Sequence, residues 1–384
     1  MHLNGLPNEC LLIIFRSLND LDDLISCSKV CERWSHLIYH RLYEVKYLTG
    51  VQSYCNSYNT VYFGKSDALK EADFWELLPN VKILDIADSN GLNYEDMINI
   101  LINSKSIKGL VYSPVLTKVM ARYCINLEMI ATRYSKTYFT DIIIHCGAKL
   151  KQLYIWYFSL RHLERFAKYL PCLERLHMDD TSGDTGWLYN GPILENLKIL
   201  EISLESFDKT NIYGGFHLID FCPTLRSAYF TIYGSSDFFF DETIKNYCLQ
   251  DLVIQYEIFE CGHYWPSLKN FLFKFPNLRH LAIRGNQKIN DNHIKELVHM
   301  LPNLIILDVR LSFGITRESA DYIAQYCREY NRFVSFYFQH DEAIRLDWPE
   351  LSVSSNRICH KFDFMKNCFL KSYTELPLLM DPID

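Results

Sequence analysis

The sequence predicts a short all-α module followed by a long α/β solenoid. Two observations support this prediction. An amphipathic helical pattern fills the first fifty residues, and a short apolar motif then recurs at nearly regular intervals over most of the chain. The composition agrees, because the 384 residues are 49% hydrophobic and include only 15 Gly and 12 Pro. Such a chain is neither mostly disordered nor collagen-like.

Charge and hydropathy exclude several classes of protein. A net charge of −7 argues against a nucleic-acid binder that works by electrostatic attraction. The longest early apolar run, Cys10 to Phe15, is far shorter than the ~20 residues of a membrane span. Thirteen cysteines are spread along the chain, and we expect reduced thiols in an intracellular protein, cytoplasmic or nuclear.

Three short helices are predicted in the first fifty residues. Pro7 precedes the first of them, where its fixed φ suits a helix N-terminus. A second helix is expected after Asp20 and a third around Trp34. The apolar residues of the first helix share one face, at i, i+3, i+4 and i+7: Leu11, Ile14, Phe15 and Leu18. Helices this short cannot bury their own apolar faces well, so a partner or the next domain should cover them.

The order of residues in this segment also carries a family resemblance. It runs Leu6-Pro7-Asn8-Glu9, Ile14-Phe15, Leu18, Asp23-Leu24 and Val30-Cys31 followed by Arg33-Trp34, over about residues 3–48. This pattern resembles the F-box. The resemblance implies a helical module, here residues 1–50, that docks on a Skp-type adaptor and through it on a cullin. The adaptor contacts that it implies are Leu6, Pro7, Leu11, Ile14, Phe15, Leu18, Leu24, Val30, Cys31 and Trp34.

A triplet of the form apolar-x-x-apolar-x-apolar then recurs eleven times, at intervals of 20 to 29 residues. Examples are Leu150-Leu153-Ile155 and Leu278-Leu281-Ile283. The last two positions alternate, so on a strand both point into the core. Helical stripes between the triplets should cover the other side of the sheet. Pro residues and several cysteines lie at the junctions before the triplets: Cys124, Cys146, Cys172, Cys222 and Cys248.

This arrangement resembles the cysteine-containing leucine-rich repeats that accompany F-boxes. It implies a horseshoe-shaped solenoid of about 11–12 repeats over residues 51–340. The cysteines are expected to be small buried side chains between turns. Residues that alternate with the core positions should face the concave side and contact a protein substrate. These are Tyr154, Trp156, His177, Asp179, Glu201, Tyr229, Arg284, Asp308, Arg310 and Tyr337.

Residues 341–384 lose the repeat but keep enough aromatic side chains to fold. We expect them to cap the end of the solenoid, which such arrays require. A tail lying across the concave face is the less favoured alternative.

Catalytic and metal-binding patterns are not found in the sequence. Cys27, Cys31, His36 and His40 lack the ~12-residue separation between the two ligand pairs of a zinc finger. No nucleophile, zinc-hydrolase or dinucleotide-binding motif occurs. We therefore expect no cofactor and no enzymatic activity of the chain itself.

Two functional hypotheses follow. The first, implied by the resemblance, is a substrate-recognition subunit of a Skp-cullin-F-box ubiquitin ligase, with the repeats holding a protein for ubiquitination. The second is a repeat scaffold without ligase activity, whose N-terminal helices only cap the solenoid. Exposure distinguishes them, since capping helices would bury Ile14, Phe15 and Trp34 against the first repeats.

Overall fold

The computed structural model describes residues 3–51, 57–64, 72–87, 94–112, 122–181, 186–205, 212–234, 237–257, 262–338 and 341–382. The chain forms two compact units. Unit 1 comprises Met1–Leu150 with Ser355–His360 and Pro377–Asp381. Unit 2 comprises Lys151–Ser354 with Lys361–Leu376 and Pro382–Asp384. Each unit therefore takes part of the C-terminal segment.

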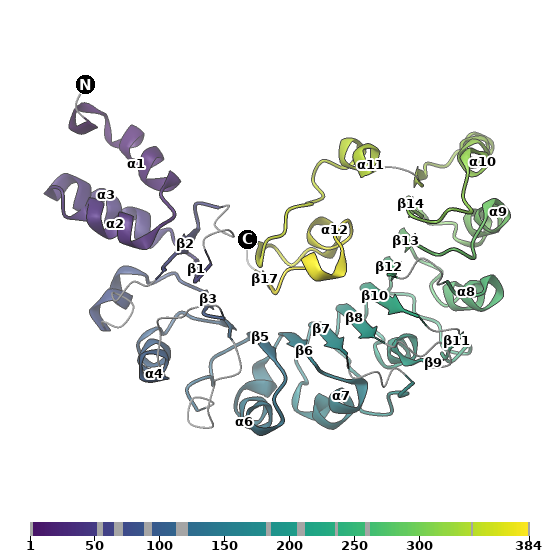
Figure 1. Cartoon of the computed structure of the whole chain (residues 1–384), viewed down its shortest axis with the longest axis horizontal. Helices are drawn as coiled ribbons and strands as arrows, with labels where there is room; N and C mark the ends of the chain where they lie inside the picture. The colour runs from purple at the N-terminus through teal and green to yellow at the C-terminus, as the bar shows by residue number, and fades with distance from the viewer. Residues whose placement is uncertain are drawn as a thin grey trace. The chain divides into compact units, whose positions relative to one another are not determined.

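Unit 1 begins with the three predicted helices. They are α1 (Asn8–Ser17), α2 (Leu21–Ser28) and α3 (Glu32–Tyr43), after a short 3-10 turn at Leu3–Gly5 (Figure 1). The Asp20 carboxylate caps α2 by accepting from the backbone N–H groups of Asp22 and Asp23. Leu11 and Phe15 of α1 are buried, as the helical spacing predicts.

A parallel sheet follows in unit 1, in the strand order β2-β1-β3-β4-β5. The strands are β1 (Tyr47–Thr49), β2 (Thr60–Tyr62), β3 (Ile83–Asp85), β4 (Gly109–Val111) and β5 (Met129–Arg133). The helical segments between and after them are η4 (Ala72–Leu77), α4 (Tyr94–Asn103), α6 (Lys136–Cys146) and η5 (Gly147–Lys149). A second, two-stranded sheet pairs β16 (Ile358–His360) with β17 (Leu379–Asp381).

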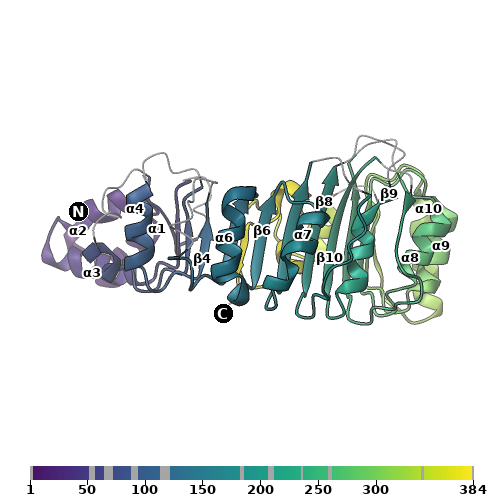
Figure 2. The same cartoon turned by 90° about the horizontal axis from the view of Figure 1, so that it is seen from below.

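Unit 2 is a longer parallel sheet whose strands follow one another in chain order. They are β6 (Gln152–Trp156), β7 (Arg175–Asp180), β8 (Ile199–Glu205), β10 (Ser227–Tyr233), β12 (Asp251–Tyr256), β13 (His280–Arg284), β14 (Ile306–Asp308) and β15 (Ser335–Tyr337). Strands β6, β8 and β10 run in one direction (Figure 2), and β7 lies between β6 and β8. A separate two-stranded ladder pairs β9 (Ile212–Tyr213) with β11 (Asp237–Phe238).

Helical segments lie on one face of the unit 2 sheet and the C-terminal helix α12 lies on the other (Figure 1). The first group is α7 (Leu160–Phe166), η6 (Ala167–Tyr169), η7 (Gly214–Phe221), α8 (Trp265–Leu272), α9 (Asp291–Met300) and α10 (Arg317–Glu329). The C-terminal group is α11 (Asp341–Asp347), α12 (Phe364–Asn367) and η8 (Tyr373–Glu375). We call the side without α7–α10 the helix-free face.

The second position of each recurring triplet forms a continuous row of core residues across this sheet. Leu176, Leu200, Ala228, Leu252 and Leu281 are register partners on successive strands, and each is 0% exposed. Each repeat therefore buries its apolar positions against its neighbours, as a solenoid does. The predicted fold class, a helical module followed by a parallel α/β solenoid, is confirmed.

The junction cysteines divide into two groups. Cys124, Cys146 and Cys222 are buried, and the thiols of Cys146 and Cys222 donate to the carbonyl four residues earlier. Cys172 and Cys248 are exposed, which corrects the prediction that all five are buried. The buried three lie three or four residues before a triplet, where the chain still faces the core. The exposed two directly precede the first residue of a triplet, in the turn or bend before the strand begins.

The C-terminal segment differs from the predicted end cap. Helix α11 packs against β15, where the Tyr337 hydroxyl donates to Asp347 at 2.7 Å. Residues 361–376 lie against the helix-free face of unit 2, the alternative that we favoured less. The physical reason is that Phe369 and Tyr373 bury apolar surface there, at 0% and 3% exposure.

Candidate functional site

Helix α1 is apolar on two faces. Leu11 and Phe15 point into the module and are 1% exposed. Ile13, on the side of α1 opposite this buried pair, is 66% exposed, and Ile14, at the edge of the buried stripe, is 38% exposed. Val30, after α2, is 57% exposed. An exposed apolar surface on a small helical module is typical of a docking site.

Two arginines fix the shape of this module. Arg33 of α3 donates to the carbonyls of Asn4 and Leu6 and to the Asn8 side chain, at 2.7, 2.5 and 2.8 Å. It thereby holds the turn that precedes α1. Arg41 is fully buried and donates to the Phe15 carbonyl, and burial lowers its pKa to about 10. Both arginines position α1 against α3.

The ten predicted adaptor contacts fall into three groups by exposure. Three are buried (Leu11, Phe15 and Leu24), four are half-buried (Leu6, Leu18, Cys31 and Trp34), and three are exposed (Pro7, Ile14 and Val30). Sequence reasoning missed the exposed Ile13 and Leu3 and the positioning role of Arg33. A helical projection of α1 would have revealed Ile13, because it lies on the opposite side from Leu11 and Phe15.

Phe15 and Trp34 contact one another inside the module, with ring centroids 5.1 Å apart in an edge-to-face arrangement. The C-terminal end of α3 contacts the rest of unit 1, where Asn80 donates to the Tyr43 carbonyl at 2.8 Å. The module thus packs on unit 1 at one end while Ile13, Ile14 and Val30 stay accessible. The contact with the rest of unit 1 therefore does not bury these three apolar side chains.

The helix-free face of unit 2 contains a buried charged cluster centred on Glu201. Arg175 donates to the Glu201 carboxylate at 2.7 Å, and His177 Nδ1 lies 3.1 Å from the same oxygen. The Cys368 thiol of the C-terminal segment donates to the other oxygen at 3.2 Å. The imidazole of His177 stacks on Tyr154 at 3.7 Å and on Tyr373 at 4.5 Å. All five residues that surround Glu201 here are themselves buried.

Electrostatics explains how this cluster is tolerated. Burial alone would raise the pKa of Glu201, but the Arg175 charge and hydrogen bonds from His177 and Cys368 outweigh it and lower the pKa. Burial lowers the pKa of His177 to about 4, so this imidazole is neutral at pH 7 and donates from Nδ1. Farther along the face, Arg284 and Arg310 overcome burial and lower the pKa of Asp308 to about 2.

Residues 368–373 lie on this face through backbone as well as side-chain groups. Arg284 donates to the carbonyls of Phe369 and Lys371, and Tyr229 donates to the same Lys371 carbonyl at 2.9 Å. The Tyr373 hydroxyl donates to the Met178 carbonyl at 2.5 Å. Recognition of peptide carbonyls by fixed donors is how many proteins bind an extended segment of another chain.

The predicted substrate contacts are mostly covered in the structure. Eight of the ten are at most 7% exposed: Tyr154, His177, Glu201, Tyr229, Arg284, Asp308, Arg310 and Tyr337. Trp156 and Asp179 are half-buried. The expectation that all ten present an open surface is therefore corrected, because the C-terminal segment and ion pairs within the face bury most of them.

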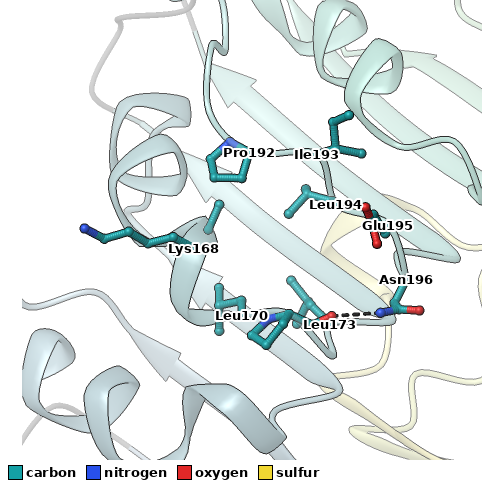
Figure 3. Close-up of a pocket in the computed structure, with 10 residues that line it drawn as sticks. Lys168, Leu170, Leu173, Pro192, Ile193, Leu194, Glu195 and Asn196 are labelled. Atoms are coloured by element: carbon teal, nitrogen blue, oxygen red, sulfur yellow. Dashed lines mark hydrogen bonds between the residues drawn. The ribbon is translucent and has the colours of Figure 1, made fainter.

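A cavity on the opposite side of unit 2 offers no catalytic chemistry. Its volume is about 180 Å³, and it lies between residues 167–173 and 192–196, with Leu170, Leu173 and Leu194 in its wall (Figure 3). Asn196 crosses its edge to donate to the Pro171 carbonyl at 2.8 Å. Pockets for small molecules usually enclose ~300 Å³ or more. Over the part of the chain that the structure describes, no His, Cys, Asp and Glu cluster could hold a metal ion.

Comparison with known proteins identifies the N-terminal module. A family model described as F-box-like matches residues 3–49. The chain therefore carries an F-box-like domain, of the kind that generally serves as a non-catalytic adaptor module. No curated protein matches the chain. Among the helices in the described ranges, none has the length and apolar content to cross a bilayer.

The solved structures that resemble the chain include the following two. One is a chain of the crystal structure of the Rad7 and Elc1 complex in yeast, at 14% identity and a TM-score of 0.39, covering 81% of this chain and 90% of that one. The other is an internalin (inlF) from Listeria monocytogenes str. 4b F2365, at 12% identity and a TM-score of 0.38, covering 89% of this chain and 96% of that one.

The buried imidazole of His177 predicts a pH dependence. Its folded-state pKa of about 4 is below the ordinary value of 6.5, so the unfolded chain binds more protons between these values. The contribution of the neutral His177 to the free energy of unfolding is therefore complete above pH 6.5 and is lost as the pH falls towards 4. Relative to His177→Gln, the wild type should lose about 3 kcal/mol of unfolding free energy over this window. Urea unfolding at several pH values measures it, and parallel curves would contradict it.

Tyr373 should hold the C-terminal segment on the helix-free face. Tyr373→Ala removes a buried ring and the hydroxyl bonded to Met178, at a cost of about 3–5 kcal/mol to that contact. We expect faster amide hydrogen exchange in residues 361–376, while the amides of β7–β10 stay protected. Tyr330→Ala, at a tyrosine that is 53% exposed, is the matched control. Unchanged exchange in residues 361–376 would show that Tyr373 does not anchor them.

Proposed function

We propose that this protein is the substrate-recognition subunit of a Skp-cullin-F-box ubiquitin ligase. The F-box-like domain binds a Skp-type adaptor, which connects it to a cullin, and the solenoid binds the protein to be ubiquitinated. The observation that carries the proposal is the match of residues 3–49 to the F-box-like model, on a module whose Ile13, Ile14 and Val30 are exposed.

The geometry of the module supports docking by apolar insertion. Ile13 projects from the side of α1 opposite the buried Leu11 and Phe15, and Ile14 lies beside that pair, so both are presented on a rigid support. Rigid presentation reduces the entropy lost on binding and favours affinity. The Arg33 hydrogen bonds hold the residues before α1 in a single conformation and so add to this support.

The proposed ligase role requires no catalytic residue in this chain. A receptor accelerates ubiquitin transfer by holding the acceptor lysine of its substrate near the enzyme that carries the activated ubiquitin. This is catalysis by proximity. A solenoid is suited to this task because its extended sheet presents many side chains to one partner. The alternative, a repeat scaffold without an adaptor, attributes no role to the exposed isoleucines of α1.

Charged substitutions on α1 should weaken adaptor binding strongly without unfolding the protein. In Ile13→Asp/Ile14→Asp, two carboxylates would be desolvated at the interface, which should cost about 2 kcal/mol or more, roughly 30-fold in Kd. The measurement is co-purification of the full chain with a Skp-type adaptor, followed by titration calorimetry. Thermal unfolding should change little, because both side chains are exposed in the free protein.

The control places the same charges on other helices of unit 1. Ile102 on α4 is 48% exposed and Ile144 on α6 is 56% exposed, so Ile102→Asp/Ile144→Asp should bind the adaptor like the wild type. If the folded wild type does not bind an adaptor, the ligase role is wrong and the scaffold hypothesis replaces it. If both double variants bind normally, the adaptor is held by another surface.

A further inference from the structure

The carboxyl ends of the unit 2 strands carry acidic and aromatic side chains beyond the region that residues 361–376 contact. We call this group the acidic rim; it comprises Trp156, Asp179, Glu205, Tyr233 and Glu257. Three of its members are carboxylates from β7, the end of β8 and the residue after β12. All five are half-buried or exposed, unlike the covered residues next to them.

Strand register places the acidic rim on the helix-free face. Asp179 alternates with the core residues Met178 and Asp180, and it is the register partner of Trp156 on one side and of Ser203 on the other. Glu205 is the register partner of Tyr233. Because alternate residues of a strand share a face, these side chains lie with His177 and Glu201 rather than with the helices.

The negative charge of the acidic rim is not neutralised by the rest of the face. Arg175 is engaged by Glu201, and Arg284 and Arg310 are engaged by Asp308. Lys371 of the C-terminal segment is buried near Cys368, and its ammonium has no hydrogen-bond partner among the described residues. In the described ranges, no lysine, arginine or histidine forms an ion pair with Asp179, Glu205 or Glu257. Among the same residues, the Glu257 carboxylate accepts a hydrogen bond from the neutral Gln255 amide.

The effect of this unbalanced charge appears in neighbouring groups. Burial and then the charges of Glu205 and Asp180 raise the pKa of Asp179 to about 6. Burial and then Glu257, Glu205 and Asp179 raise the pKa of Tyr233 to about 12. A cation placed among these carboxylates would reverse the repulsion between them.

A polar group in the floor of the acidic rim also lacks a partner. Thr231 is 0% exposed, and its hydroxyl has no hydrogen-bond partner among the described residues. Its strand position lies between Ser203 and Gln255 in register, so it belongs to the same row as Asp179. A buried oxygen of this kind, together with the unpartnered Asp179 Oδ1, offers acceptors to an incoming N–H donor.

We propose that the acidic rim binds a basic segment of a protein partner. Lysine or arginine side chains of that segment would pair with Asp179, Glu205 and Glu257, and Trp156 and Tyr233 would contact them through their ring faces. The inference rests on the proposed function, since it states the chemical class of the substrate segment. A metal ion is a poorer occupant, because the described residues contain no group with metal-binding geometry.

The test uses the full-length chain and a fluorescein-labelled peptide of four Arg-Ser repeats, with a Glu-Ser peptide of equal length as comparison. Fluorescence anisotropy should show binding of the Arg-Ser peptide only, weakening as salt increases. Asp179→Asn/Glu205→Gln/Glu257→Gln should weaken binding roughly tenfold, as three partly exposed ion pairs would. These changes keep the shape of each side chain and relieve repulsion, so the fold should survive.

The matched control removes the same charge elsewhere in unit 2. Glu195, Glu329 and Glu350 are exposed, and Glu195→Gln/Glu329→Gln/Glu350→Gln should leave binding within about twofold of wild type. Trp156→Leu, which leaves the charge unchanged, should weaken binding several-fold. The proposal is overturned if both triple variants weaken binding equally, if the Glu-Ser peptide binds as well, or if neither peptide binds.

Failure here is separable from failure of the ligase role. Adaptor binding is measured on the N-terminal module, and peptide binding is measured on unit 2 without any adaptor present. A chain that binds an adaptor but no basic peptide keeps the proposed function and loses this inference. A chain that binds the peptide but no adaptor keeps the acidic rim as the binding surface of a scaffold.

Discussion

The helix-free face of unit 2 depends on keeping Glu201 ionised where no water reaches it. Its carboxylate is 0% exposed, and the Arg175 guanidinium beside it is 1% exposed. Removing one partner of such a pair typically costs about 3–5 kcal/mol, because the remaining charge is buried without a partner. The neighbouring side chains add hydrogen bonds that stabilise the ionised carboxylate. His177 is neutral and donates a hydrogen bond from Nδ1 to the Glu201 carboxylate. The Cys368 thiol, from the C-terminal segment, donates to the other carboxylate oxygen. The segment thus completes a charge network as well as burying apolar surface.

This dependence explains why the face is divided. Where residues 368–373 contact it, Glu201 is paired with Arg175 and Asp308 is paired with Arg284 and Arg310, and these side chains are buried. At the edge of the face, Asp179 and Glu205 are half-buried and Glu257 is exposed, and none of the three forms an ion pair among the described residues. Matched, buried charges support the fold, whereas unmatched charges at the edge are available for another molecule. The division follows from desolvation, since an unpaired carboxylate is tolerated only where water can still reach it.

The sequence was sufficient for the fold class and for the positions of most strands. The triplet works because its last two positions alternate on a strand, so their burial follows from the pleat alone. Leu176 and Leu200 behave in this way. The path of the C-terminal segment could not be derived, because its contacts are backbone carbonyls bound by Arg284 and Tyr229, and these leave no periodic signal. The same limit applies to Arg33, whose acceptors are mostly carbonyl oxygens. Exposed Ile13 has a different reason: it lies outside the i, i+3, i+4, i+7 stripe of α1, and periodicity identifies only the face that the helix buries.

The division of the C-terminal segment between the two units has a consequence for biosynthesis. Unit 1 receives β17, whose Asp381 accepts from the Tyr47 hydroxyl at 2.6 Å, and unit 2 receives Cys368 and Tyr373. Neither unit can reach its final set of contacts until residues 358–381 have left the ribosome. The parallel sheet of each unit must therefore wait during synthesis for a segment that lies far from it in the sequence. Removal of residues 358–381 would leave both units incomplete rather than one intact and one damaged.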